Sequence, residues 1–117
     1  MAHSPNETGW VCRSVAAPAL DADPGKLLKT GTALLCSVSY HNTTGSDAFI
    51  QIFDASALSG VTVGTTVADF QVVCAANAAE TVVFSIPLHF TNGICAFSTT
   101  AHGGSSDAVV DVWFGVA

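Results

Sequence analysis

Histidine, serine, cysteine and aspartate are the residue types of this chain that could perform chemistry. The four histidines, His3, His41, His89 and His102, lie far apart in the sequence. No two of them have the i, i+2 or i, i+4 spacing of a local metal-ligand pair. The serines are not accompanied by a GxSxG nucleophile motif. We therefore predict no catalytic, cofactor-binding or metal-binding residue, and we expect that the protein is not an enzyme.

Two pairs of carboxylates are the remaining candidates for a cation site. Asp21 lies near Asp23, and Asp107 lies near Asp111. Neither pair belongs to an acidic loop with the spacing of an EF-hand. We interpret both pairs as solvated surface carboxylates, with calcium binding as the alternative.

The four cysteines are Cys12, Cys36, Cys74 and Cys95. They contain no CxxC pair, which excludes a zinc ribbon or a dithiol redox motif. Four cysteines allow three disulfide connectivities. Cys36 and Cys74 fall on the apolar side of their predicted strands, where a free thiol behaves as a small hydrophobic group. This pattern favours buried free thiols, and disulfides are the alternative.

The elements that carry these residues are predicted to be strands. In the central stretch 33–54, Leu34, Cys36, Val38 and Tyr40 alternate with less apolar residues, as in a half-buried strand. The turn-forming residues HNTTGSD and a second apolar run follow, which predicts a β-hairpin. Similar patterns predict seven strands, at 10–15, 34–40, 48–53, 69–74, 81–88, 94–98 and 108–114.

Residues 16–29 contain Pro18, Pro24 and Gly25, so we expect a loop there, followed by a short extended piece at 26–28. No segment has a sustained helical period. The fold class is therefore predicted to be all-β, a single-domain antiparallel β-sandwich or jelly roll. Residues 1–22 would form an N-terminal arm and the first strand, and residues 23–117 the sandwich domain.

Composition indicates a soluble chain that covers apolar surface with partner subunits. Hydrophobic residues make up 50% of the 117 residues and charged residues only 10%, against about 25% charged in an average soluble protein. The net charge of −6 argues against nucleic acid and anionic membranes as partners. The chain has no run of about 20 apolar residues and no signal-peptide pattern at its start. We expect a soluble protein made in the cytoplasm.

Large apolar side chains on the less apolar side of the predicted strands are candidates for a subunit interface. The uncharged connection 55–68, with a candidate short strand at 61–63, would either contact a neighbouring chain or fold over its own sheet. The interface candidates are Trp10, Leu35, Phe49, Phe53, Val61, Val63 and Trp113.

Several short motifs resemble those of a known family. They are Pro24-Gly25-Lys26-Leu27-Leu28, Tyr40-His41-Asn42, the strand 49–54, Val63-Gly64-Thr65-Thr66 and the stretch 88–97, LHFTNGICAF. From Asp23 to its end, the chain resembles small β-sandwich structural proteins encoded by tailed phages and prophages.

The resemblance implies a noncatalytic virion structural protein, foremost a capsid decoration (cement) protein. Its location would be the virion capsid surface. Its partners would be the major capsid protein and further copies of itself in a homo-oligomer such as a trimer, with an N-terminal arm at residues 1–9 reaching across capsid subunits. The alternative is a tail or fibre component, or a receptor- or glycan-binding module using Trp10 or Trp113.

Overall fold

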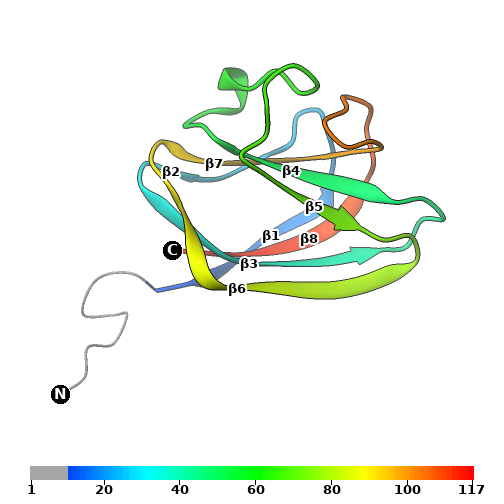
Figure 1. Ribbon diagram of the computed structural model, residues 1–117, viewed down its shortest axis with the longest axis horizontal. Coiled ribbons are helices and arrows are strands. Elements are labelled where there is room, and N and C mark those ends of the chain that lie inside the picture. The colour runs from blue at the N-terminus through cyan, green and yellow to red at the C-terminus, as the bar shows by residue number, and fades with distance from the viewer. Residues whose placement is uncertain (1–10) are drawn as a thin grey trace.

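The computed structural model describes residues 11–117 (Figure 1). Trp10, the first of the interface candidates, lies outside the described residues. The described part is built from eight strands and one short 3-10 helix. Their bounds are β1 (Arg13–Leu20), β2 (Lys26–Thr30), β3 (Ala33–Asn42), β4 (Ala48–Asp54), η1 (Leu58–Gly60), β5 (Phe70–Cys74), β6 (Ala78–Phe90), β7 (Gly93–Thr99) and β8 (Val110–Val116).

The strands form two antiparallel four-stranded sheets packed face to face. Sheet A has the order β1-β8-β3-β6, and sheet B has the order β2-β7-β4-β5. Every connection between consecutive strands passes from one sheet to the other, except that between β4 and β5. Eight strands with such crossings are the arrangement of a jelly roll. The predicted all-β sandwich is confirmed.

The predicted central hairpin is wrong, because β3 and β4 lie in different sheets. β3 pairs with β6 and β8, whereas β4 pairs with β5 and β7. The polar connection between them therefore crosses the edge of the sandwich. Asn42 holds this crossing: its side-chain amide donates to the carbonyl oxygens of Ser46, at 2.9 Å, and Cys74, at 3.0 Å.

The first strand extends further than predicted and belongs to the sandwich. β1 pairs with β8 from Arg13 to Leu20, across a stretch expected to be a loop. Pro18 is tolerated there because β1 is an edge strand, where a missing N–H leaves no ladder partner unsatisfied. The register shifts between Ala17 and Leu20, and Ala19 adopts a positive φ of 52°. The sandwich therefore includes residues 13–20, which lie ahead of the predicted domain boundary at residue 23.

The main core lies between the two sheets and is made by side chains of alternate residues on each strand. On β8 these are Val110, Val112, Phe114 and Val116, each at most 5% exposed. Inward residues of β3 and β4, among them Leu35 and Ile50, pack in the same cluster. Because side chains alternate along a strand, burying these residues turns Asp111, Trp113 and Gly115 to the outer face of sheet A.

Asp54, at the end of β4, anchors the crossing from β6 to β7. Its carboxylate accepts the backbone N–H groups of Thr91 at 3.1 Å, Asn92 at 2.8 Å and Gly93 at 3.4 Å. Gly93 has a φ of +153°, and a β-carbon there would lie 2.6 Å from the carbonyl oxygens of Ala55 and Lys29. The turn therefore requires both a glycine and an anionic acceptor.

These hydrogen bonds make the charge of Asp54 part of the folding free energy. Burial by itself would raise the pKa of the Asp54 carboxyl, but the backbone N–H groups of Asn92, Thr91 and Gly93, together with nearby His89, hold the pKa below its ordinary value of 3.8. A lowered folded-state pKa contributes stability above the unfolded pKa, and this contribution is lost as the pH falls through the folded value.

Asp54→Asn should therefore lower the free energy of unfolding at pH 7 by about 2 kcal/mol, because hydrogen bonds to a charged acceptor are lost. Urea unfolding of the two proteins between pH 7 and pH 3 measures this difference. The gap between wild type and variant should narrow below about pH 4. Asp23→Asn, at an exposed position in the β1–β2 turn, is the control. Equal losses for both variants would contradict the assigned role of Asp54.

Candidate functional site

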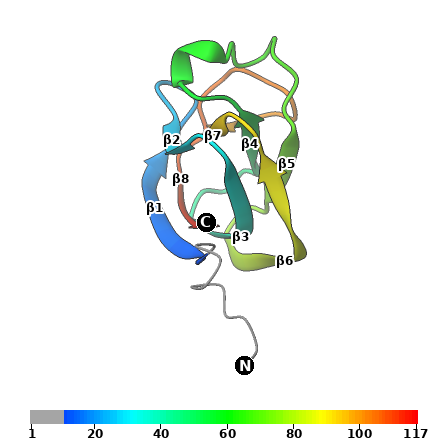
Figure 2. The same ribbon diagram turned by 90° about the vertical axis from the view of Figure 1, so that its left-hand side faces the viewer.

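The two outer faces of the sandwich differ in what covers them. The connection 55–69 folds over the outer face of sheet B (Figure 2). Leu58, Val61 and Val63 of this connection pack against a second apolar cluster made of Phe53, Cys95 and Phe97. The uncharged connection thus covers its own sheet, and the predicted short strand at Val61–Val63 is absent from the described residues.

A second connection adds to this cover. Gln51, on β4, is fully buried, and its side-chain amide donates to Thr99 Oγ1 at 2.9 Å and to the carbonyl oxygen of Gly104 at 3.0 Å. Gln71, on β5, accepts the N–H of Gly103 at 3.0 Å. These bonds hold the β7–β8 connection against sheet B. The outer face of sheet B is therefore occupied by the chain itself.

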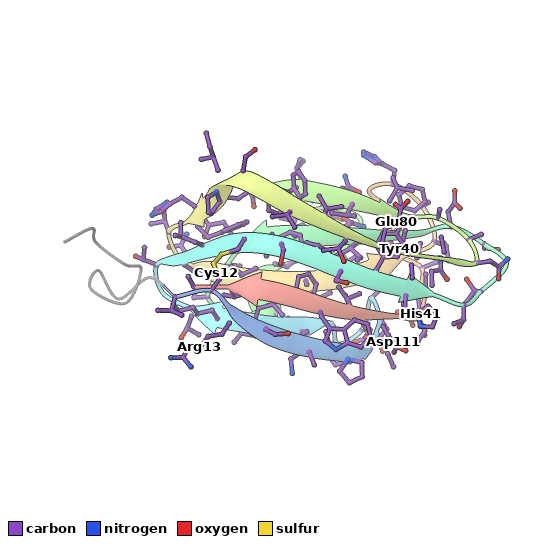
Figure 3. All side chains as sticks on the ribbon, turned by 90° about the horizontal axis from the view of Figure 1, so that it is seen from below. Cys12, Arg13, Tyr40, His41, Glu80 and Asp111 are labelled. Atoms are coloured by element: carbon purple, nitrogen blue, oxygen red, sulfur yellow. A yellow bond between two sulfur atoms is a disulfide. The ribbon has the colours of Figure 1, made fainter. Side chains whose placement is uncertain are left out.

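Residues 11–117 place no such cover over the outer face of sheet A, and this face is uncharged at its centre (Figure 3). The strand register places its outward residues in two adjacent rows that each cross all four strands. Neither row contains an ionisable side chain. We call these eight residues the platform: Ala16, Trp113, Ser39 and Thr81 in one row, and Ser14, Gly115, Ser37 and Val83 in the other.

The platform has one large projection beside one hollow. Trp113 is 41% exposed and Val83 is 72% exposed. Next to Trp113 is a hollow of about 280 Å³, lined in part by Ser14, Ser37 and Gly115. The floor of the hollow stays low because residue 115 has no side chain: a β-carbon there would collide with Ser37 Oγ.

Among the described residues, charged groups lie at the two ends and rims of this face and not at its centre. Arg13, which is paired with inward Val116, is at the rim of one end; the carboxylates of Asp111 and of Glu80, which is paired with inward Tyr40, are at the other end together with His41 (Figure 3). The Asp111 carboxylate accepts the backbone N–H of Ala19 at 2.8 Å. The Glu80 carboxylate accepts the hydroxyl of Tyr40 at 2.9 Å. Both acidic groups therefore stabilise the fold as well as charging this end.

Tyr40 links the two sheets at the acidic end. Its hydroxyl also accepts the N–H of Ala75, beyond the end of β5, at 3.4 Å. Burial raises the pKa of the Tyr40 hydroxyl; the bond from Ala75 opposes this rise, and the Glu80 carboxylate adds to it. The hydroxyl therefore stays protonated and keeps donating to Glu80 at neutral pH.

The cysteines divide into one surface disulfide and two buried thiols. Cys12 and Cys36 form a disulfide beside the platform, so the free-thiol interpretation is wrong for this pair. The register shift between Leu35 and Ser37 interrupts the alternation at Cys36, which is why it does not follow the apolar side of β3. Cys74 and Cys95 are free and buried, as predicted.

Burial makes both free thiols unreactive. It raises the pKa of Cys74 from 9.0 to about 12, and it also raises the pKa of Cys95. The Cys95 thiol donates to the carbonyl oxygen of Ala55 at 3.4 Å. Because the thiolate is the nucleophile, neither residue is suited to covalent catalysis.

Iodoacetamide should therefore modify Cys74 about 1,000-fold more slowly in the folded protein than after unfolding at pH 8, following the rise in its pKa. Intact mass should show no adduct on the native chain and two adducts on the unfolded, unreduced chain, one on each free cysteine. Reduction before unfolding supplies the control, with all four cysteines modified. Equal rates in the folded and unfolded states would contradict the burial argument.

The histidines and carboxylates form no metal site in the described part of the chain. Between residues 11 and 117, no group of three or more histidine, cysteine, aspartate or glutamate side chains could hold a metal ion. One hollow of about 200 Å³ is lined by Asp54, Asp69 and His89. Both of its carboxylates already accept hydrogen bonds from the backbone: Asp69 accepts the N–H of Asp54 at 2.7 Å, and Asp54 accepts the N–H groups of the β6–β7 turn. His3 lies outside the described residues.

The predicted interface residues do not form one surface. Leu35 is fully buried in the main core, and Phe53 is 1% exposed beneath the 55–69 connection. The chain itself covers these two side chains, Leu35 between the sheets and Phe53 under the connection, so neither is available to a partner subunit. Phe49 is half-buried and meets His102 edge-on, with ring centroids 6.2 Å apart. Of the described candidates, only Trp113 lies on the platform.

The rest of the platform was missed because its members are small. Alternation along the last strand identified Trp113, but Ser37, Ser39 and Gly115 carry no distinctive sequence signal. Their importance comes from cross-strand register, which joins residues from four separate segments. The alternation of serine with apolar residues along β3 was the available clue.

No family model matches this chain, and no curated protein or solved structure matches it. Among the described residues, no helix has the length and apolar character needed to cross a membrane.

Proposed function

We propose that this chain is a noncatalytic structural protein of a phage virion, and specifically a capsid decoration protein on the outside of the head. The observation that carries the proposal is the contrast between the two outer faces. Sheet B is covered by the chain's own connections, whereas sheet A presents an uncharged platform with an exposed tryptophan. Aromatic residues on a surface with few charges are typical of the centres of protein interfaces.

The fold and the sequence resemblance both support this assignment. The jelly roll is used by viral capsid domains and also by lectins, so the fold by itself does not select a function. The resemblance of residues 23–117 to small phage structural proteins favours the first of these uses. The partners would be the major capsid protein and further copies of this chain.

Decoration would work through repetition rather than through one strong contact. A shell offers many equivalent sites, so that subunits linked to one another hold it with an avidity that exceeds each single contact. The net charge of −6 would keep unbound copies soluble. We assign the capsid contact to residues 1–9, which lie outside the described residues and precede the disulfide at Cys12.

A receptor- or glycan-binding module of a tail or fibre is the second candidate, favoured by the exposure of Trp113 beside hydroxyl groups. Two observations weaken it. Ser39 and Thr81 hydrogen-bond each other at 2.9 Å, and Asp111 is engaged by Ala19. Few polar groups beside Trp113 are therefore left for the hydroxyls of a sugar.

Co-sedimentation with empty capsids that lack this protein tests the assignment. The full chain should saturate the shell in a fixed ratio, and deletion of residues 2–9 should abolish binding while leaving the circular dichroism spectrum unchanged. Asp23→Asn, which changes one charge at an exposed position of the folded domain, is the control and should still bind. A chain that ignores capsids but binds on a glycan array would establish the second candidate instead.

A further inference from the structure

We propose that a second copy of this chain covers the platform, in a two-fold dimer in which Trp113 of each copy fills the hollow over Gly115 of the other. The inference deepens the proposed function and rests on it in taking the platform as a contact surface. It names the partner on that surface and the alignment of the two chains.

The register itself makes the platform complementary to its own copy. Trp113 and Gly115 are neighbours on the same face of β8, separated only by the inward Phe114. Consider a two-fold axis that lies midway between the two faces, runs perpendicular to the strands and passes over Phe114 of each β8. This axis places position 113 of each copy opposite position 115 of the other. The projecting indole of each copy then meets the low floor of the other, and such an isologous contact closes after two subunits.

The same axis pairs the other platform residues without any clash of charge. Ser14 would face Ala16, Ser37 would face Ser39, and Val83 would face Thr81, because each pair lies in register with Gly115 and Trp113. Every facing side chain is small or uncharged. The sheets can therefore approach to the spacing of about 10 Å that stacked sheets adopt.

The charged ends select this antiparallel alignment over the parallel one. The axis reverses one face relative to the other, so that the Arg13 end of each copy meets the end with His41, Glu80 and Asp111 of its partner (Figure 3). A parallel alignment would instead place the acidic ends together. Two copies with a net charge of −6 repel each other overall, and the uncharged platform adds no local repulsion at the contact.

The size of the whole outer face of sheet A, of which the platform is the centre, predicts a weak dimer. Seven residues of a strand such as β8, with about 3.3 Å per residue and about 4.8 Å between four strands, give a projected face of about 440 Å². Two such faces together give about 880 Å², which is below the roughly 1,000 Å² of a stable specific interface and fits a weak one. We expect a dissociation constant on the order of 10–100 μM, which assembly on a repetitive shell would strengthen.

Sedimentation velocity of the full, oxidised chain over a concentration series tests the dimer. Wild type should pass from monomer to dimer, and Trp113→Glu should weaken association at least 10-fold. Val67→Glu is the matched control, because Val67 is 87% exposed on the connection that covers sheet B; it should dimerise like wild type. Association of wild type that Trp113→Glu leaves unchanged, or a wild type that stays monomeric up to millimolar concentration, would overturn the proposal.

A pair of complementary variants tests the alignment independently of Trp113. Ser14→Lys and Ala16→Asp should each weaken self-association, since each buries a lone charge. Mixing them should restore a dimer, because Lys at 14 of one copy then faces Asp at 16 of the other. A mixture no more associated than either variant alone would overturn the antiparallel register.

Fluorescence adds a readout at the proposed contact. The chain has two tryptophans, so in a Trp10→Phe background the emission reports Trp113 alone. It should shift to shorter wavelength as the concentration rises through the dimerisation range. A shift caused by a glycan in a protein that stays monomeric would overturn the dimer and identify a sugar-binding face.

The two proposals can fail separately. A dimer that ignores capsids would overturn the virion role and leave the self-contact intact. A chain that saturates capsids equally well as wild type and as Trp113→Glu, with no dimer in solution, would retain the virion role and remove the self-contact.

Discussion

The structure depends on burying the inward apolar side chains of strands that come from distant parts of the chain. β8 illustrates the constraint, since its inward valines and Phe114 pack in the core against residues of β3 and β4. Because the side-chain period of a strand is two, this burial leaves one place for the alternate residues, the outer face of sheet A. The arrangement of the platform is thus a consequence of the core, and a one-residue slip of β8 would bury Asp111 and Trp113 while exposing Phe114.

The two outer faces differ in how much of the chain covers them, because the connections between strands differ in length. The connection between β4 and β5, the only one that stays within a sheet, is long and apolar enough to cover sheet B. The other connections join the two sheets, and all of them except the one from β7 to β8 are short turns. The turn from β6 to β7 is an example, in which Asp54 accepts three backbone N–H groups. Nothing in the described chain lies over sheet A. The proposed dimer supplies from a second copy the cover that the first cannot provide.

Cysteine chemistry follows the same division between core and surface. Cys74 and Cys95 are held as protonated thiols by the low polarity of their surroundings. Cys12 and Cys36 lie beside the platform and are joined, and in a reducing compartment the same pair would be thiols. The disulfide ties the start of β1 to β3 next to the hollow, so the oxidation state bears on how firmly this end of the platform is held.

Alternation and turn residues in the sequence determined the strands and the all-β class: the strands around Val38, Ile50, Val72 and Val112 were found, with ends that differ by one to several residues. These signals are local, because each depends on side chains a few positions apart. Which strands pair was decided only by the tertiary structure, as the false hairpin between β3 and β4 shows. The same is true of the Cys12–Cys36 bond, the burial of Leu35 and Phe53, and the meeting of Trp113 with Gly115, Ser37 and Ser14. Each of these depends on register between segments far apart in the chain, and register follows from the packing of the whole core.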